Sequence, residues 1–236
     1  MSDCAAGAEP QIESLGEAAL VLRFGNAIDE ALNQRVLGAW RALERAAIPG
    51  VIESIPAYAT LTVCFDPMRH DAVALAARLH SLLHGVCAPD PVEGRRVELP
   101  VCYEGEHAPD IDELAQHAGL SVAEVRRRHS ATEYRVFFLG FSPGFPYLGG
   151  LDPALAMPRR DTPRLAVPAG SVAIGGAQTG VYPQRSPGGW RLIGRTPVRL
   201  FDPSREPACL LSPGDRLRFV PVTAAEFARL QSGVPT

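Results

Sequence analysis

The chain has 236 residues, of which 46% are hydrophobic and 21% are charged, and its formal net charge is -3. This composition is typical of a soluble globular protein with one large or two small domains. The charge argues against nucleic acid as the main partner, and no apolar run approaches the ~20 residues of a membrane helix. The first residues show no signal-peptide pattern. We therefore expect a cytoplasmic protein that binds neither nucleic acid nor membrane.

Residue usage limits the chemistry further. The five cysteines are scattered and never form C-x-x-C, which indicates reduced thiols rather than a disulfide framework or a zinc site. The sequence contains no lysine, so all 23 of its Lys and Arg residues are arginine. It therefore lacks a P-loop lysine, a Schiff-base lysine and a lysine that carries biotin. We expect no metal or covalent cofactor on this chain, and ATP chemistry only with the help of other chains.

The first 90 residues predict a small α+β domain. Hydrophobic patterns and turn residues predict two strands, a helix, two further strands and a second helix, in the order ββαββα. Asp71 is expected to cap the second helix, on which His80 and His84 lie four residues apart. This spacing suits metal ligands, but no third ligand is evident, so we favour solvated or capping histidines. The predicted elements occupy residues 11–16, 18–25, 29–46, 50–58, 59–67 and 72–85.

A Pro-, Gly- and charge-rich stretch at residues 87–96 predicts the boundary to a second domain, 91–236. A strand, two short helices and another strand are expected first, with Ser121 and Glu124 as a capping box. From residue 140 onward, Gly and Pro alternate with apolar residues. This pattern predicts short strands and structured loops in a β-barrel or curled sheet. A closing strand and a terminal helix capped by Thr223 complete the domain.

The stretch "FLGFSPGFPYLGG" contains G-x-S-x-G around Ser142, the pattern of a serine-hydrolase nucleophile elbow. An elbow needs a backbone N–H on the residue after the serine, but here that residue is Pro143. Pro146 and the glycines behind it also prevent a helix, and the last histidine, His129, precedes the serine. We therefore do not expect Ser142 to be a nucleophile.

The same loop suits another role. Its glycines, among them Gly144, allow close approach of a ligand or another chain. Phe141, Phe145 and Tyr147 supply large, stiff contact surfaces. Two interpretations remain open: a pocket or subunit contact, and a rigid barrel-closing loop with buried aromatic residues.

Three linked motifs resemble one known family. "GFSPGFPYLGGL", "MPRRDTPRLAVPAGSVAIGGAQTGVYP" and "SPGGWRLIGRTPVRLFDP" are similar to the B-subunit of 5-oxoprolinase, whose family includes KipI and allophanate hydrolase subunit 1. The one departure is "IGGAQTG" in place of the more usual "IAGAQTG". The resemblance implies a small α+β domain followed by a mainly-β, cyclophilin-like barrel.

The resemblance also implies a function. With a KipA-like C-subunit and a third subunit, such a chain opens 5-oxo-L-proline to L-glutamate, using ATP and water. Three alternatives are a KipI-like inhibitor of a sporulation histidine kinase, a carboxyltransferase half working on urea or an amide with biotin on another chain, and a prolyl isomerase. Only analogy to the barrel supports the last of these.

The residues within the motifs supply candidates for binding 5-oxoproline. Arg159, Arg164 and Arg195 suit its carboxylate because guanidinium groups bind carboxylates with two hydrogen bonds. Surface salt bridges are an equally good interpretation of each. Gln178 and Thr179 can donate to and accept from the lactam amide, or form a polar turn.

Aromatic and titratable residues complete the prediction. Tyr182 and Trp190 can wall a pocket or belong to the core. His129 and Arg164 are candidate catalytic groups, although a histidine near a helix end is common for other reasons. Ser186 is interpreted as a turn residue. The predicted substrate or partner pocket comprises Phe141, Gly144, Phe145, Tyr147, Arg159, Arg164, Gln178, Thr179, Tyr182, Trp190 and Arg195.

Overall fold

The computed structural model describes residues 9–84 and 94–233. The chain divides into two compact units, residues 1–93 and 94–236. The boundary expected after residue 90 lies outside the described residues. Each unit has its own hydrophobic core.

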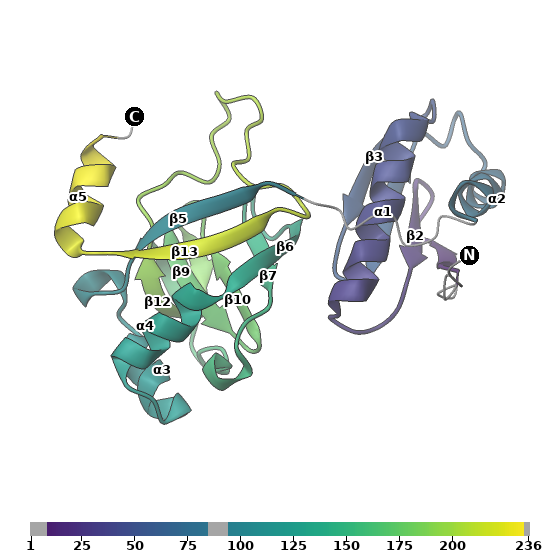
Figure 1. Cartoon of the computed structure of the whole chain (residues 1–236). Helices are drawn as coiled ribbons and strands as arrows, with labels where there is room; N and C mark the ends of the chain where they lie inside the picture. The colour runs from purple at the N-terminus through teal and green to yellow at the C-terminus, as the bar shows by residue number, and fades with distance from the viewer. Residues whose placement is uncertain (1–8, 85–93, 234–236) are drawn as a thin grey trace, which may run out of the picture. The chain divides into compact units, whose positions relative to one another are not determined.

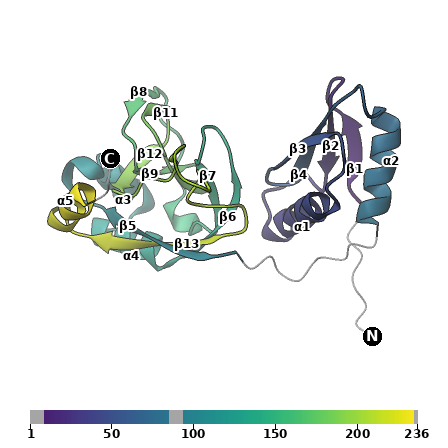
Figure 2. The same ribbon diagram turned by 90° about the horizontal axis from the view of Figure 1, so that it is seen from above.

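The N-terminal unit is an antiparallel sheet with strand order β1-β2-β4-β3 and two helices (Figures 1 and 2). Its elements follow the predicted order ββαββα and comprise β1 (Gln11–Ser14), β2 (Ala19–Arg23), α1 (Glu30–Ala46), β3 (Val51–Pro56), β4 (Thr60–Phe65) and α2 (Ala72–Leu83).

Local signals explain where these helices begin. The Asp29 carboxylate accepts a hydrogen bond from the backbone N–H of Leu32 at 2.9 Å, and Asp71 accepts one from Ala74 at the same distance. Each aspartate thus satisfies one of the backbone donors left free at a helix start. Alternating residues of the central strands then bury their side chains against the helices. The core consists mainly of Leu20, Leu22, Val36, Leu43, Leu61, Val63, Phe65, Leu75 and Leu79.

The C-terminal unit is a closed barrel of seven strands, in the order β10-β7-β6-β13-β5-β12-β9 (Figure 1). A separate two-stranded ribbon pairs β8 with β11. The strands are β5 (Arg96–Cys102), β6 (Glu133–Leu139), β7 (Pro146–Gly149), β8 (Arg164–Val167), β9 (Ser171–Gly175), β10 (Gln178–Val181), β11 (Ser186–Gly188), β12 (Arg191–Arg195) and β13 (Arg216–Val222).

Strand β13 closes the barrel because it pairs with two strands from earlier in the chain. It runs parallel to β5 and antiparallel to β6. Three helices accompany the barrel: α3 (Ile111–Ala118), α4 (Val122–Ala131) and the terminal helix α5 (Ala224–Ser232). Thr223 caps α5 as predicted, in a complete capping box with Glu226.

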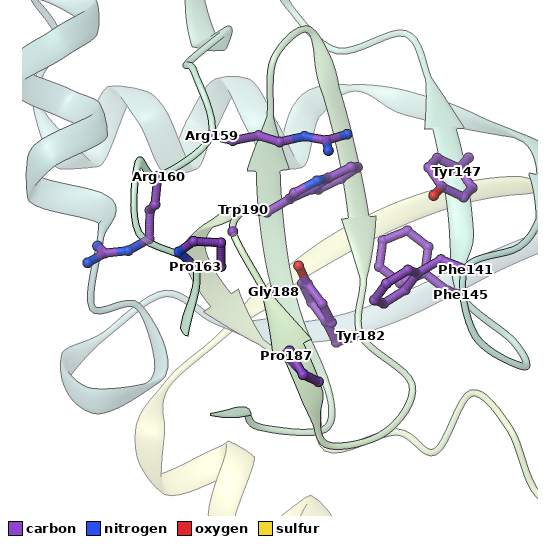
Figure 3. Close-up of a pocket in the computed structure, with 11 residues that line it drawn as sticks. Phe141, Phe145, Tyr147, Arg159, Arg160, Pro163, Tyr182, Pro187, Gly188 and Trp190 are labelled. Carbon is purple, nitrogen blue, oxygen red and sulfur yellow. The ribbon is translucent and has the colours of Figure 1, made fainter. Parts of the chain in front are cut away.

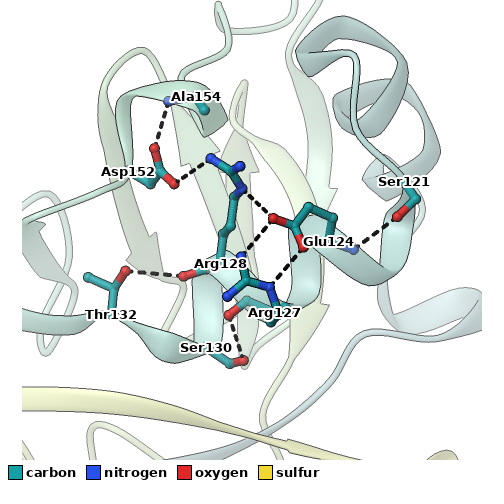
Figure 4. A network of polar contacts seen from close by, with 8 residues as sticks. All are labelled: Ser121, Glu124, Arg127, Arg128, Ser130, Thr132, Asp152 and Ala154. Atoms are coloured by element: carbon teal, nitrogen blue, oxygen red, sulfur yellow. Dashed lines mark hydrogen bonds and ion pairs between the residues drawn. The ribbon is translucent and has the colours of Figure 1, made fainter.

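Only one of the two hydrogen bonds of the predicted capping box of α4 is present. The Ser121 hydroxyl accepts a hydrogen bond from the Glu124 backbone N–H at 3.2 Å, but the Glu124 carboxylate binds Arg127 and Arg128 (Figure 4). The hydrogen bond from Arg127, and then that from Arg128, lowers the pKa of Glu124 to about 2. Arg128 also reaches Asp152 at 3.2 Å, which ties α4 to the loop after β7.

Strand β9 is buried on both faces, and this burial positions the site. Val172 and Ile174 point into the barrel core, whereas Ala173 packs into a second apolar cluster on the opposite face. Because successive strand residues point to opposite faces, the second cluster lies outside the barrel wall. This outer cluster consists of Phe145, Val167, Ala173, Tyr182, Trp190 and Leu192, with Tyr147 packed against it.

Candidate functional site

A pocket of about 190 Å³ opens within this outer cluster (Figure 3). It is smaller than the ~300–1,000 Å³ of pockets that hold drug-sized ligands, so it suits a small metabolite or a single side chain. Its walls come from the β6–β7 turn, β7, the segment before β8, and the residues around β11. The lining residues are Phe141, Phe145, Tyr147, Arg159, Arg160, Pro163, Tyr182, Pro187, Gly188, Gly189 and Trp190.

Aromatic rings in edge-to-face contact form the pocket wall. The centroid of the Phe145 ring lies 5.3 Å from that of Tyr182 and 5.6 Å from that of Trp190, and the interplanar angles are 84° and 86°. Tyr147 lies 5.1 Å from Phe145. Aromatic rings favour such edge-on arrangements because the positive ring edge meets the negative ring face. The contacts make the wall rigid.

Three glycines make room for these rings. A Cβ atom at Gly175 would lie 2.6 Å from the Trp190 indole, and one at Gly188 would lie 2.3 Å from the Tyr182 hydroxyl oxygen. A Cβ at Gly180 would lie 2.9 Å from the Phe145 ring. Any side chain at these positions would displace a wall residue. The Gly-rich spacing of the sequence is therefore required for the pocket.

Arg159 supplies positive charge at the pocket. Its guanidinium carbon lies 5.7 Å from the centroid of the Trp190 ring, within the range of a cation–π contact. Its side chain is exposed, and among the ion pairs of the described residues it has no carboxylate partner. The charge of Arg159 is therefore available to an anion.

Two phenol groups add hydrogen-bonding capacity. Burial raises the pKa of Tyr147 and Tyr182, so both hydroxyl groups stay protonated at neutral pH. The Tyr182 hydroxyl oxygen also accepts a hydrogen bond from the Trp190 backbone N–H. The pocket thus combines aromatic walls, a cation without a carboxylate partner among the described residues, and two neutral hydroxyl groups.

Behind the pocket lies a buried carboxylate that the sequence did not single out. Asp110 is 3% exposed and accepts hydrogen bonds from both terminal nitrogens of Arg164, at 2.9 and 2.7 Å. It also accepts one from the backbone N–H of Leu192, at 2.6 Å, and a longer one from Arg160, at 3.4 Å. Asp110 precedes helix α3, a position that suggests a cap, but no sequence signal pointed to these partners.

Phe141 stands at the pocket in an unusual backbone conformation. Its φ angle is +63°, in the left-handed region, and its side chain is 62% exposed. A bulky residue with positive φ is a genuine outlier, and such strain concentrates at functional sites. The Phe141 ring meets Phe145 and Tyr182 edge-on, at 5.4 and 6.2 Å. The tight β6–β7 turn thus presents an aromatic ring to solvent beside the pocket.

The structure agrees with the rejection of Ser142 as an elbow nucleophile. The chain continues from this turn into strand β7, not into a helix. The Ser142 hydroxyl oxygen is buried and has no hydrogen-bond partner among the residues that the structure describes. His129, the last histidine in the sequence, bonds other groups. Ser142 therefore has no activating base among these contacts.

His129 is fully buried inside the barrel unit. The Thr179 hydroxyl donates to the carbonyl oxygen of Ala173, so His129 Nε2 must donate to Thr179, at 3.0 Å. The other ring nitrogen, Nδ1, then accepts from the Tyr103 hydroxyl, at 2.8 Å. Burial lowers the pKa of His129 to about 3, so the imidazole is neutral. His129 lies in the last turn of α4, as expected for a helix-end histidine, and its buried ring is hydrogen-bonded at both nitrogens.

Two of the predicted pocket residues belong to strand β10 and lie outside the pocket lining. Thr179 is fully buried, and its neighbour Gly180 faces the outer cluster, because adjacent strand residues point to opposite faces. Gln178, the first residue of β10, is half-buried. Thr179 therefore points into the barrel, away from the pocket, whereas Gln178 shares the face of Gly180 without lining the pocket.

Three further predicted pocket residues are engaged elsewhere. Gly144 packs against Phe201, and Arg195 donates to the carbonyl of Ala169. Arg164 is bound to the buried carboxylate behind the pocket. Of the predicted set, the residues that the structure brings together are Phe141, Phe145, Tyr147, Arg159, Tyr182 and Trp190.

His80 and His84 both contact one carboxylate. Their ring nitrogens lie 2.7 and 2.5 Å from the oxygens of Glu9, which the sequence had not linked to them. Within residues 9–84 and 94–233, no group of three or more His, Cys, Asp or Glu has the geometry to hold a metal ion. Spanning a membrane requires a helix of sufficient length and hydrophobicity. Among residues 9–84 and 94–233, no helix is long and apolar enough to cross a membrane.

The chain thus consists of an α+β unit followed by a closed β-barrel that carries an aromatic pocket on its outer wall. Comparison with known proteins shows which family has this architecture. The family described as carboxyltransferase domain, subdomain C and D, matches residues 10–211. The 5-oxoprolinase B-subunit of Bacillus subtilis (strain 168) is 44% identical over 92% of this chain and 95% of its own length. That of Escherichia coli O157:H7 is 47% identical over 88% and 94%. The chain belongs to the 5-oxoprolinase B-subunit family.

A solved structure shows the same fold within a longer chain. The structure of TTHA0988 is 44% identical and aligns with a TM-score of 0.77. The alignment covers 88% of this chain, which spans only 40% of the longer one.

Proposed function

We propose that this chain is a non-autonomous subunit of an ATP-dependent 5-oxoprolinase, which hydrolyses 5-oxo-L-proline to L-glutamate. Membership of the B-subunit family, with relatives 44% and 47% identical over most of their length, supports this function. The partners are a KipA-like C-subunit and a third subunit. Together they act in the cytoplasm.

The observation that carries the proposal for the site is the position of Arg159 over Trp190, where the described residues give it no carboxylate partner. The substrate is a small ring with a carboxylate and a planar amide. Arg159 binds the carboxylate, since a guanidinium matches a carboxylate with two charge-assisted hydrogen bonds. The aromatic wall of Phe145, Tyr182 and Trp190 packs against the ring, and the hydroxyl of Tyr147 or Tyr182 donates to the amide oxygen.

The pocket binds and orients, but it does not complete the reaction. A lactam carbonyl resists attack by water and needs activation. The chain has no lysine for a P-loop, and its buried His129 is neutral and holds two hydrogen bonds. Activation by ATP therefore takes place with groups of the other subunits, and no metal or covalent cofactor resides on this chain. We assign the barrel to the cyclophilin-like type, on the support of its seven-strand closure.

The test is reconstitution of the complex. This chain is co-purified with both partner subunits, and glutamate release from 5-oxo-L-proline is measured with and without ATP. ATP-dependent release that requires this chain supports the proposal. If the complex assembles and releases no more glutamate than the same mixture without this chain, the proposal is wrong.

A second candidate is one half of a biotin-dependent carboxyltransferase, which the name of the matching family favours. The chain has no lysine to carry biotin, so biotin would reside on another chain. Avidin separates the two candidates because it sequesters biotin. Glutamate release that persists with avidin supports the 5-oxoprolinase, whereas urea- or amide-dependent turnover that avidin abolishes supports the carboxyltransferase.

A further inference from the structure

Two segments from distant parts of the chain build the charged side of the pocket. One runs from Met157 to Arg164 and carries Arg159, and the other runs from Gly188 to Leu192 and carries Trp190. Backbone contacts join them: the N–H of Arg160 donates to the carbonyl of Gly189, at 2.7 Å. The position of Arg159 over the indole therefore depends on how the two segments are held together.

Asp110 is the group that binds both segments at once. Its carboxylate accepts two hydrogen bonds from Arg164 on the first segment, and one from the backbone N–H of Leu192 on the second. Its own backbone N–H donates to the carbonyl of Leu192, at 2.9 Å. The Asp110 side chain is 4% exposed, so water competes little with these bonds.

The two neighbouring arginines of the first segment divide their roles. In Figure 3 the Arg160 side chain points away from Trp190, whereas Arg159 extends along it. Arg160 contacts Asp110, at 3.4 Å, and Arg159 contacts the indole. The negative charge of Asp110 is thus paired with Arg160 and Arg164. Arg159 has no carboxylate partner among the residues that the structure describes, so its charge can meet an external anion.

We propose that Asp110 is the positioning residue of the pocket: by holding Arg164 and Leu192 together, it fixes Arg159 over Trp190 in the orientation that receives a substrate carboxylate. Asp110 does not touch the ligand. This inference rests on the proposed function only for the identity of the ligand, because the geometry of the Arg159–Trp190 pair is measurable without it.

The first experiment measures that geometry directly. Trp40 and Trp190 are the two tryptophans of the chain, so Trp40→Phe makes Trp190 the sole indole reporter. In this background, Asp110→Asn is expected to shift Trp190 emission in the same direction as Arg159→Gln, because both remove the cation from the ring. Asp112→Asn changes an exposed carboxylate on α3, the helix that follows Asp110, and is expected to leave the emission unchanged. If Asp110→Asn also leaves it unchanged, the inference is overturned.

The second experiment is a double-mutant cycle in the reconstituted complex. Arg159→Gln is expected to raise the KM for 5-oxo-L-proline about 10- to 100-fold, the value of a charge-assisted hydrogen bond. Asp110→Asn is expected to raise it between about 2- and 30-fold with little change in kcat, and to add nothing to Arg159→Gln. Independent, additive effects would mean that Asp110 merely stabilises the fold, and the inference would fail.

The outcomes separate this inference from the proposed function. If Arg159→Gln leaves KM unchanged in an active complex, the pocket is not the substrate site, whatever the fluorescence shows. If Arg159→Gln raises KM and Asp110 acts independently, only the positioning role is wrong. Should Asp110→Asn not fold, Arg164→Lys takes its place, since it keeps the charge and loses the two-pronged contact. It is expected to raise KM without adding to Arg159→Gln, and an additive effect would overturn the inference.

Discussion

The imidazole Nε2 of His129 donates to the Thr179 hydroxyl, at 3.0 Å, inside the closed barrel. The ring also stacks on Phe219, with 4.7 Å between ring centroids. Both side chains are fully buried and do not line the pocket. His129 also gives the barrel a titratable group whose protonation opposes folding.

The first prediction concerns acid stability. The pKa of His129 is about 3 in the folded chain and 6.5 ordinarily, so between these values the unfolded chain binds a proton that the folded chain does not. The contribution of His129 to the free energy of unfolding is therefore constant above pH 6.5. Below pH 6.5 it falls by up to about 1.4 kcal/mol per pH unit. His129→Gln is expected to remove this slope, measured by urea unfolding. His117→Gln, at an exposed position, should keep the wild-type slope; an unchanged slope in His129→Gln contradicts the prediction.

The measurement is best made above pH 4.5. The pKa of Glu124 is about 2 in the folded chain, against 4.5 ordinarily, because Arg127 and Arg128 bind its charged form. Its stabilising contribution is present above pH 4.5 and is lost as the pH falls toward 2. Between pH 6.5 and 4.5 the slope from His129 is thus free of the slope from Glu124.

The second prediction compares two adjacent glycines. A Cβ at Gly188 would lie 2.3 Å from the Tyr182 hydroxyl oxygen, whereas the nearest atom to one at Gly189 lies at 3.6 Å. Gly188→Ala must displace Tyr182, and we expect a loss of roughly 1–3 kcal/mol from overpacking. Gly189→Ala is expected to cost less, since its contact distance is ordinary. Thermal unfolding of both variants tests this, and equal melting temperatures would contradict it.

The third prediction concerns two serines. The Ser142 hydroxyl is buried and finds no hydrogen-bond partner in the described part of the chain. Ser142→Ala therefore removes an unsatisfied group and is expected to be neutral or stabilising. Activity of the complex should also persist, because no elbow is present. By contrast, Ser121→Ala removes the N-cap of α4 and should cost about 1 kcal/mol. Complete loss of activity in a folded, assembled Ser142→Ala complex would restore Ser142 as a catalytic candidate.

The fourth prediction tests whether the strain at Phe141 serves function. Glycine adopts positive φ without cost, so Phe141→Gly is expected to change the free energy of unfolding by less than about 1 kcal/mol, with relief of strain offset by lost ring contacts. The same variant should raise the KM for the lactam or weaken binding of the partner subunits. Phe145→Ala, at a 2% exposed position, should instead cost roughly 3–5 kcal/mol. Wild-type kinetics and assembly in Phe141→Gly would remove its functional role.

Much of the fold was predictable because its signals are local. Asp71 and Thr223 cap helices as expected, since a cap depends on residues three positions away. The same holds for the rejection of the elbow, which needed only Pro143 and the glycines after it. The aromatic pocket residues were also found together, because they lie in three dense motifs.

The sequence is least informative where strand direction or distant pairing decides. Adjacent strand residues point to opposite faces, so the side chains of Gln178 and Thr179 do not face the same side of the sheet. The burial of His129 depends on a barrel closed by β13, a strand from the far end of the chain.

By itself, the sequence determined the order of the elements, the helix caps, the absence of lysine chemistry and the family, because these depend on neighbouring residues or on composition. Only the tertiary structure decided which arginine pairs with a carboxylate among the residues that the structure describes. The sequence alone does not distinguish Arg159 from Arg164, but Arg164 meets the Asp110 carboxylate, 54 residues earlier in the chain, and Arg159 meets the face of Trp190. This pairing depends on contacts between segments far apart in the sequence, so only the folded chain reveals it.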